Sequence, residues 1–237
     1  MKKIFYILII INFLFSSDQI PAPKQKHPIM LRGAKIHTIS NGVIENGDLI
    51  FDKGKIINVG KYLTDVPDSI EIIDVKGMYI YPGLISAIST LGLQEIGAVR
   101  ATRDYSETGS INPNVRANVS YNPDSELIPI SRSNGVLLSL SVPRSGLVSG
   151  MSSLMMLDGW TWEDATLKHP VGLHIFWPNM RIPKNKTRNK KHRKTQLESI
   201  QKIDSLFYAA HAYLKLKESA SLSFKLYSEL SIGAYNC

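Results

Sequence analysis

The chain has 237 residues, which allows one or two domains, and its 43% hydrophobic and 20% charged residues exclude a wholly disordered protein. The only cysteine is the last residue, Cys237, so an intrachain disulfide framework is excluded as well. The formal net charge of +8 has a local source, because residues 181–194 hold eight of the 28 Lys and Arg residues and no acid.

Residues 1–17 have the order of a secretory signal peptide. Lys2 and Lys3 precede an apolar run, and Ser16 and Ser17 follow it. This order predicts export from the cytoplasm, to the periplasm or the medium. An uncleaved membrane anchor is the alternative, but an apolar run of about a dozen residues is short for a helix that crosses a bilayer.

Residues 29–80 alternate between short apolar runs and turn dipeptides. Asn or Gly residues follow the runs at positions 41–42, 46–47 and 54, where hairpin turns need a positive φ. This spacing predicts a β-meander that forms a small sheet or sandwich. Alternating residues such as Ile50 and Val59 are expected to form its buried face.

The pattern changes after Gly83, where turn signals are more widely spaced. Residues 102–126 contain two Asn-Pro steps and little apolar periodicity, which predicts a long structured loop. Residues 135–142 and 171–178 are each predicted to be a buried strand. This region also contains three tryptophans, Trp160, Trp162 and Trp177. They could share an apolar patch, but tryptophans in such positions pack in a core more often, and we expect that here.

The C-terminal third begins with the basic run of residues 181–194. We interpret this run as a solvated surface loop, and the alternative is a contact for an anionic surface. No aromatic residue lies within the run, so nucleic-acid binding is not favoured. Thr195 and Glu198 have the spacing of a capping box that starts a helix. The expected apolar face of that helix comprises Leu197, Ile200, Ile203, Phe207, Ala210 and Leu214. Residues 221–237 have no clear period and are unassigned.

Two segments resemble a known family. Residues 52–60, DKGKIINVG, and residues 73–87, IDVKGMYIYPGLISA, are similar to the entry of the amidohydrolase superfamily, most closely its imidazolonepropionase-like branch. Residues 135–150 resemble that branch's second barrel strand and loop. The resemblance extends over residues 29–215. It implies an α/β fold in which a small N-terminal β-sandwich, residues 29–80, leads into a (β/α)8 TIM-type barrel.

The resemblance also implies a divalent, zinc-like metal and the hydrolysis of a carbon–nitrogen bond in a cyclic amide, with metal-bound water as the nucleophile. In the family, the first barrel strand ends in an Asp-Ala-His-x-His segment. In this chain Ser86 replaces the Asp, and Ile88 and Thr90 occupy the two His positions. On a regular strand such a pair lies on one face and can hold one metal together. Neither Ile nor Thr is an equivalent ligand, so no metal residue is assigned.

Acidic residues gather in or near the loop that follows this strand. In barrels of this type such loops lie on the catalytic face, so a general acid or base could be among them, although solvated loop acids are the simpler interpretation. His169 and His174 are expected to be structural histidines, because five residues apart on a strand places them on opposite faces. The pocket candidates are Glu95, Asp104, Glu107, Asp124, Glu126 and His174.

The length indicates an incomplete barrel, which we place in residues 81–220. Eight βα units need about 200 residues or more, whereas residues 78–237 number 160. Either a second chain or another copy completes the barrel, or the sequence is truncated. The functional alternatives are an amidohydrolase-like enzyme that acts on a small cyclic amide and a non-catalytic fragment or binding module.

Overall fold

The computed structural model describes residues 20–181 and 186–233, and the predicted signal peptide of residues 1–17 lies outside them. Contacts divide the chain into two compact units. The first comprises Met1–Tyr105, Arg116–Val142 and Met151–Gly172. The second comprises Ser106–Val115, Pro143–Gly150 and Leu173–Cys237. The export that the N-terminal sequence predicts stays a prediction.

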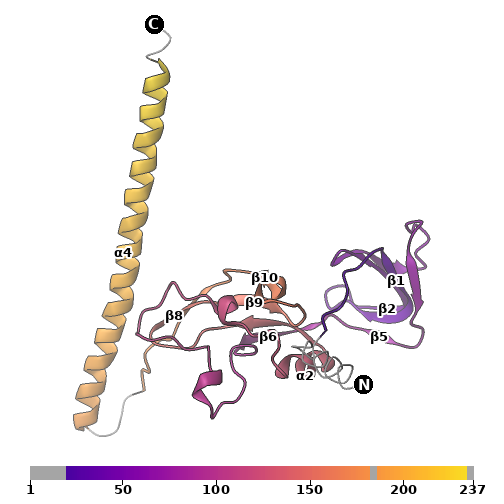
Figure 1. The fold of residues 1–237 in the computed structure, drawn as a ribbon, viewed down its shortest axis with the longest axis horizontal. Helices are drawn as coiled ribbons and strands as arrows, with labels where there is room; N and C mark the ends of the chain where they lie inside the picture. Colours follow the sequence, from indigo (N-terminus) through magenta and orange to yellow (C-terminus); the bar gives the residue numbers. More distant parts are fainter. Residues whose placement is uncertain (1–19, 182–185, 234–237) are drawn as a thin grey trace, which may run out of the picture. The chain divides into compact units, whose positions relative to one another are not determined.

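The N-terminal strands form one mixed sheet (Figure 1). Its members are β1 (Ile29–His37), β2 (Val43–Asp52), β3 (Lys55–Lys61), β4 (Glu71–Asp74) and β5 (Tyr79–Ile80). The order is β3-β2-β1-β4, and β5 also pairs with β1. The hairpins β1-β2 and β2-β3 are antiparallel, which confirms the predicted meander, whereas β4 and β5 pair parallel to β1.

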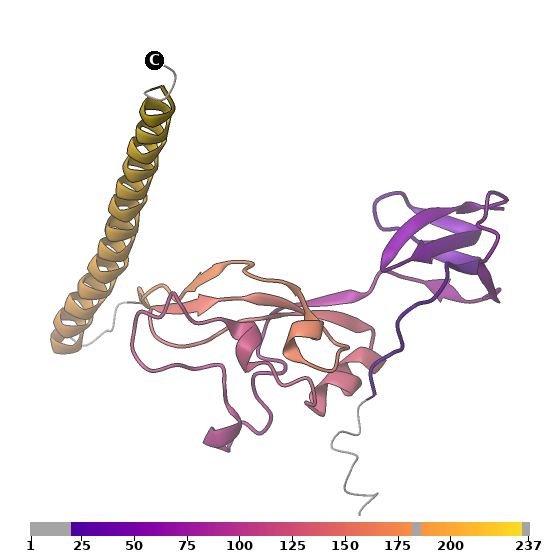
Figure 2. The same ribbon diagram turned by 45° about the horizontal axis from the view of Figure 1, so that its top comes forward.

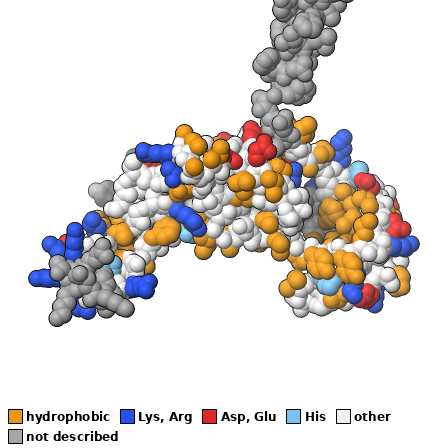
Figure 3. All heavy atoms as spheres, turned by 90° about the horizontal axis from the view of Figure 1, so that it is seen from below, with side chains coloured by type: hydrophobic (Ala, Val, Ile, Leu, Met, Phe, Trp, Pro, Cys, Tyr) orange, Lys and Arg blue, Asp and Glu red, His pale blue; other side chains and the backbone are white. Residues whose placement is uncertain are grey.

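The small sheet buries one apolar set and leaves another exposed. Met30, Ala34, Ile36 and Ile50 are each at most 4% exposed. Val59 is 36% exposed, so its predicted place in the core is wrong. Figure 3 shows hydrophobic side chains on the surface of this sheet, and the exposed members of β3 and β5 are Ile56, Ile57, Val59 and Tyr79.

A second sheet, of four strands, has the order β10-β9-β7-β6 (Figure 2). Its strands are β6 (Leu84–Ser89), β7 (Val136–Ser141), β9 (Ser153–Met156) and β10 (Thr166–Lys168). β6 and β7 are parallel, as expected for two consecutive barrel strands. The antiparallel pairing of β9 with the other edge of β7 was not predicted.

Short helices and one further strand pair complete this region. The helices are η1 (Arg100–Thr102), η2 (Ala117–Ser120), α2 (Leu127–Ser133) and α3 (Trp162–Ala165). β8 (Val148–Met151) pairs with β11 (Leu173–Ile175), which is shorter than the strand predicted over residues 171–178. The loop predicted over residues 102–126 is confirmed apart from the 3-10 helix η2 and Thr102, the last residue of η1.

The core beside the second sheet comprises Leu93, Ala117, Tyr121, Ile128, Met155, Leu157 and Ala165. Trp162 packs against this core, as predicted. Trp160 and Trp177 are each 59% exposed, so their predicted place in a shared core is wrong. Whether a tryptophan is buried depends on tertiary contacts, which the local sequence does not reveal.

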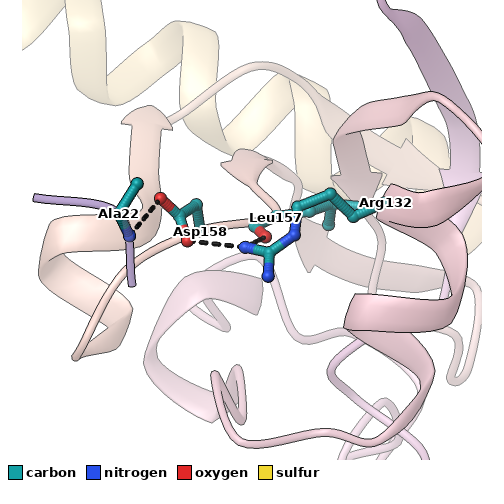
Figure 4. A network of polar contacts seen from close by, with 4 residues as sticks. All are labelled: Ala22, Arg132, Leu157 and Asp158. Carbon is teal, nitrogen blue, oxygen red and sulfur yellow. Dashed lines mark hydrogen bonds and ion pairs between the residues drawn. The ribbon is translucent and has the colours of Figure 1, made fainter. Parts of the chain in front are cut away.

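A salt bridge and three hydrogen bonds connect the first described residues to α2 and the end of β9 (Figure 4). Arg132 Nη1 donates to Asp158 Oδ1 at 2.6 Å and to the Leu157 carbonyl at 3.2 Å. The other Asp158 oxygen accepts from the Ala22 backbone N–H at 3.2 Å. One carboxylate therefore holds both the helix and the N-terminal segment.

The C-terminal helix α4 extends over Lys186–Gly233 (Figure 1). It begins nine positions before Thr195, so the basic residues from Lys186 onward are helical and the predicted loop is wrong there. Thr195 lies within the helix, where its hydroxyl donates to the Lys191 carbonyl, so the predicted capping box is wrong as well. The unassigned tail is helical up to Gly233. No described helix has the length and hydropathy needed to cross a bilayer.

Only part of the predicted apolar face of α4 is buried. Ile203 is 4% exposed, whereas Leu197, Phe207 and Leu214 are 61%, 49% and 51% exposed. Within the second unit, His192 Nε2 and Gln196 Nε2 both bond the Asn179 carbonyl oxygen, at 2.9 Å and 2.5 Å. The side of the helix that carries these polar contacts also buries Ile203.

Candidate functional site

The strand end that the family uses for its first metal ligands is irregular in this chain. Ile88 has φ +58°, and β6 ends at Ser89, so Thr90 lies outside the strand. A β-branched residue in the left-handed region is rare and strained. The alternation that places two residues of a regular strand on one face therefore does not apply to Ile88 and Thr90.

Within the described residues, no group of three or more His, Cys, Asp or Glu side chains could hold a metal ion. Ile88 offers no donor atom, and a neutral Thr hydroxyl is a poor ligand for a zinc-like ion. The residues present at this strand end therefore do not fit the metal that the resemblance implies.

The loop after β6 is fixed by serines at the ends of two strands. The Ser89 hydroxyl accepts from the Leu91 N–H at 3.0 Å. The Ser141 hydroxyl, from the end of β7, donates to the Leu91 carbonyl at 3.1 Å. Ser141 is fully buried, so this contact is shielded from water. Two neighbouring strands thus determine where the loop begins.

Glu95 is the candidate acid with the best-defined surroundings. One of its carboxylate oxygens accepts from Ser125 Oγ at 2.8 Å and the other from Asn122 Nδ2 at 3.3 Å. The Asn122 side chain also accepts from the Asp124 N–H at 3.1 Å, which forms an Asx turn. The structure therefore brings Glu95 and Asp124 to the same turn.

Tyr121, which the sequence analysis did not single out, lies in the core beside this turn. It is 4% exposed, and its hydroxyl has no hydrogen-bond partner in the part of the chain that the structure describes. Burial raises the pKa of the Tyr121 phenol, and the nearby Glu95 charge adds to the rise. The phenol therefore stays neutral and can act as a hydrogen-bond donor. Its flanking residues Ser120 and Asn122 are polar, so no periodicity marked it as buried.

The other acidic candidates have exposed side chains. Asp104 has an exposed side chain, and its backbone N–H donates to the Leu93 carbonyl at 2.8 Å. Glu107 belongs to the second unit and bonds the backbone N–H and hydroxyl of Thr108, which lower the pKa of its carboxyl. Glu126 precedes α2 without capping it through its side chain.

The two histidines have different surroundings. His169 Nδ1 is 2.8 Å from the hydroxyl of Ser153, which is fully buried, in agreement with the predicted structural role. His174 lies on β11, and partial burial lowers the pKa of its imidazole. His169 falls in the first unit and His174 in the second.

Comparisons with known proteins give two informative matches. No family model matches the chain. It is 26% identical over 153 residues to an adenine deaminase of Kosmotoga olearia, covering 60% of this chain and 26% of that protein. The crystal structure of an amidohydrolase from Thermotoga maritima MSB8 matches 80% of this chain and 49% of its own, with 27% identity and a TM-score of 0.66. The chain thus spans at most about half the length of either protein.

Proposed function

Since the chain is related to the amidohydrolase superfamily, we propose that it forms the N-terminal part of a hydrolase of the imidazolonepropionase-like branch, which cleaves a carbon–nitrogen bond in a cyclic amide or a related small molecule. The similarity to the Thermotoga maritima structure over 80% of the chain carries this proposal. The adenine deaminase match favours the same bond, because a deaminase also breaks a carbon–nitrogen bond.

The chain's own contribution is the support of a loop on the catalytic face. In a barrel of this type, the loops that follow the parallel strands carry the chemistry. The loop after β6 is held by Ser89 and Ser141, and its Glu95 is held by Ser125 and Asn122. We therefore assign Glu95 to positioning this loop and derive no hydrolytic step from the described residues.

The proposal is tested on the protein purified from its source through a tag on this chain. We expect turnover of a cyclic amide from a panel that includes hydantoin and dihydrouracil, with loss of turnover after chelation. The recombinant chain alone is expected to bind less than about one-tenth of a zinc ion, because the strand end lacks the paired ligands.

Two results would count against this function. If the purified protein turns over no cyclic amide and contains no metal, the non-catalytic binding module becomes the better account. If the recombinant chain alone binds one zinc ion tightly, the assignment of this chain to loop support is wrong.

A second proposal concerns the free edge of β6. Leu84, Ile85 and Ile88 are 60%, 58% and 58% exposed, and they lie on both faces of the strand. β7 is paired on both sides, with β6 and with β9, so further barrel strands can join this sheet at β6 or β10. Because the chain covers only 49% of the solved amidohydrolase, we propose that a second polypeptide with the remaining strands pairs with β6.

The β6 edge is tested with Ile85→Lys. A lysine at this exposed position leaves the fold intact but opposes burial, so association with the second polypeptide should weaken at least about tenfold. Ile56→Lys, at a 68% exposed position of β3, is the matched control and should change nothing. Light scattering gives the mass of the assembly. A native protein with the mass of one chain, or equal effects of both variants, contradicts the proposal.

A further inference from the structure

A groove of about 550 Å³ opens on the small sheet, within residues 32–76. This volume is in the range of small-molecule sites. It belongs to neither the loop after β6 nor the β6 edge. The side chains that give it chemical character are Arg32, Asn46, Tyr62, Thr64 and Lys76.

The two walls of the groove are held together by a buried carboxylate. Asp48 is 4% exposed, and its two oxygens accept from the backbone N–H groups of Gly33 at 3.1 Å and Leu63 at 3.0 Å. Gly33 belongs to β1, and Leu63 lies in the segment after β3. Because one rigid side chain fixes both walls, the groove is preorganised.

The residues that line the groove carry one net positive charge, from Arg32 and Lys76 against the carboxylate of Asp48. Lys76 Nζ lies 3.4 Å from Asp74, but these two side chains are 74% and 64% exposed, so the pair is weak. Arg32 Nη2 donates to Met30 Sδ at 3.4 Å, and a thioether does not neutralise a guanidinium. Asp74 does not line the groove, and both oxygens of Asp48 accept from backbone N–H groups, so Arg32 and Lys76 are the charged side chains left to pair with a ligand.

Lys76 is held in place by its hydrophobic stem. A Cβ at Gly33 would lie 2.6 Å from Lys76 Cγ, so the stem packs directly over this glycine. Gly33 has φ +84°, a conformation that glycine adopts without strain. The absence of a side chain at position 33 therefore lets the Lys76 stem lie against β1 at the groove.

Tyr62 presents an aromatic side chain at the groove in a strained conformation. Its φ is +52°, and the residue is 78% exposed. A non-glycine residue in this region costs about 1–3 kcal/mol and persists only where its surroundings impose it. The bond from the neighbouring Leu63 N–H to buried Asp48 supplies that constraint.

We propose that this groove binds a small organic anion that carries a planar ring. The anionic group pairs with Arg32 and Lys76, and the ring packs against Tyr62. Asn46 and Thr64 offer neutral hydrogen-bond donors to the same ligand. This site is independent of the proposed hydrolase function, since all its residues lie on the small sheet and its connections.

The experiment is a calorimetric titration of the protein with phenyl phosphate at constant ionic strength. We expect one saturable site, and weaker binding of inorganic phosphate because it lacks the ring. Arg32→Gln and Lys76→Gln should each weaken phenyl phosphate binding by about tenfold, the effect of one charge-assisted contact. Tyr62→Asn, which tolerates the left-handed backbone, should remove the preference for the aryl compound.

Lys55→Gln is the matched control, because Lys55 is an exposed lysine of β3 that does not line the groove. Thermal unfolding of each variant establishes that it is folded. Absence of saturable binding, or equal losses in Lys55→Gln and the two groove variants, overturns the proposal. Equal affinity for phenyl phosphate and inorganic phosphate overturns the role of the ring.

Discussion

Asp48→Ala is expected to unfold the small sheet. The side chain is 4% exposed and accepts two backbone hydrogen bonds, from Gly33 and Leu63. Alanine removes both acceptors and leaves two N–H groups without their partner. With about 1.5–3 kcal/mol for each bond to a charged group, the loss is about 3–6 kcal/mol. That loss is comparable with the whole stability of a small domain.

Hydrogen exchange of the amides in residues 29–61 measures this effect directly. Asp48→Asn keeps one acceptor oxygen and should lose about half as much protection free energy as Asp48→Ala. Glu45→Ala is the control on the same strand, because its ion pair with Lys35 is exposed to solvent and contributes little to stability. If the amides of Asp48→Ala are as well protected from exchange as those of Glu45→Ala, the Asp48 carboxylate does not stabilise the sheet.

The β-meander could be predicted because its signals are local. Lys53 and Gly54 have φ +48° and +72° at the β2-β3 turn, as the Asp-Lys-Gly sequence indicates. Alternation between such turns is sufficient to place the strands. The parallel pairing of β4 and β5 with β1 was not predictable, because parallel partners are joined by no tight turn.

The start of α4 was predicted incorrectly because two local rules competed. The Thr195 and Glu198 spacing resembles a cap, but Lys, Arg and Gln are good helix formers, so the basic run extends the helix toward its N-terminus. The exposure of Leu197 and Phe207 could not be predicted either. Periodicity defines an apolar face but does not show whether another element covers it.

For the candidate site, the residue composition predicted the loop of residues 102–126 but not the side-chain contacts that this loop makes. The Asx turn at Asn122 joins residues two positions apart, whereas the bond between Glu95 and Ser125 joins residues 30 positions apart. Likewise, the substitution of both family histidines was evident in the sequence, but the left-handed conformation of Ile88 was not. A hydrophobic run gives no local sign of such a bend.

Gly92→Ala is expected to disrupt both the core and the loop that holds Glu95. Gly92 has φ +75°, and a Cβ there would overlap the ring of Tyr121, which is buried in the core. The Gly92 carbonyl also accepts from the Asn122 N–H at 2.7 Å, so a shift here displaces the turn that carries Asn122 and Ser125. Left-handed strain of about 1–2 kcal/mol and overpacking of about 1–3 kcal/mol predict a loss of about 2–5 kcal/mol.

Gly135→Ala is the control that separates backbone strain from overlap with the Tyr121 ring. Gly135 has φ +83°, but a Cβ there would meet no atom within 4 Å, so only the backbone strain of about 1–2 kcal/mol is expected. Urea unfolding followed by tryptophan fluorescence reports on the core, because Trp162 packs against it. Equal midpoints for the two variants would mean that the Tyr121 ring yields to the new methyl group. A lower midpoint for Gly92→Ala would show that close contact with the ring fixes the glycine, and with it the turn that positions Glu95.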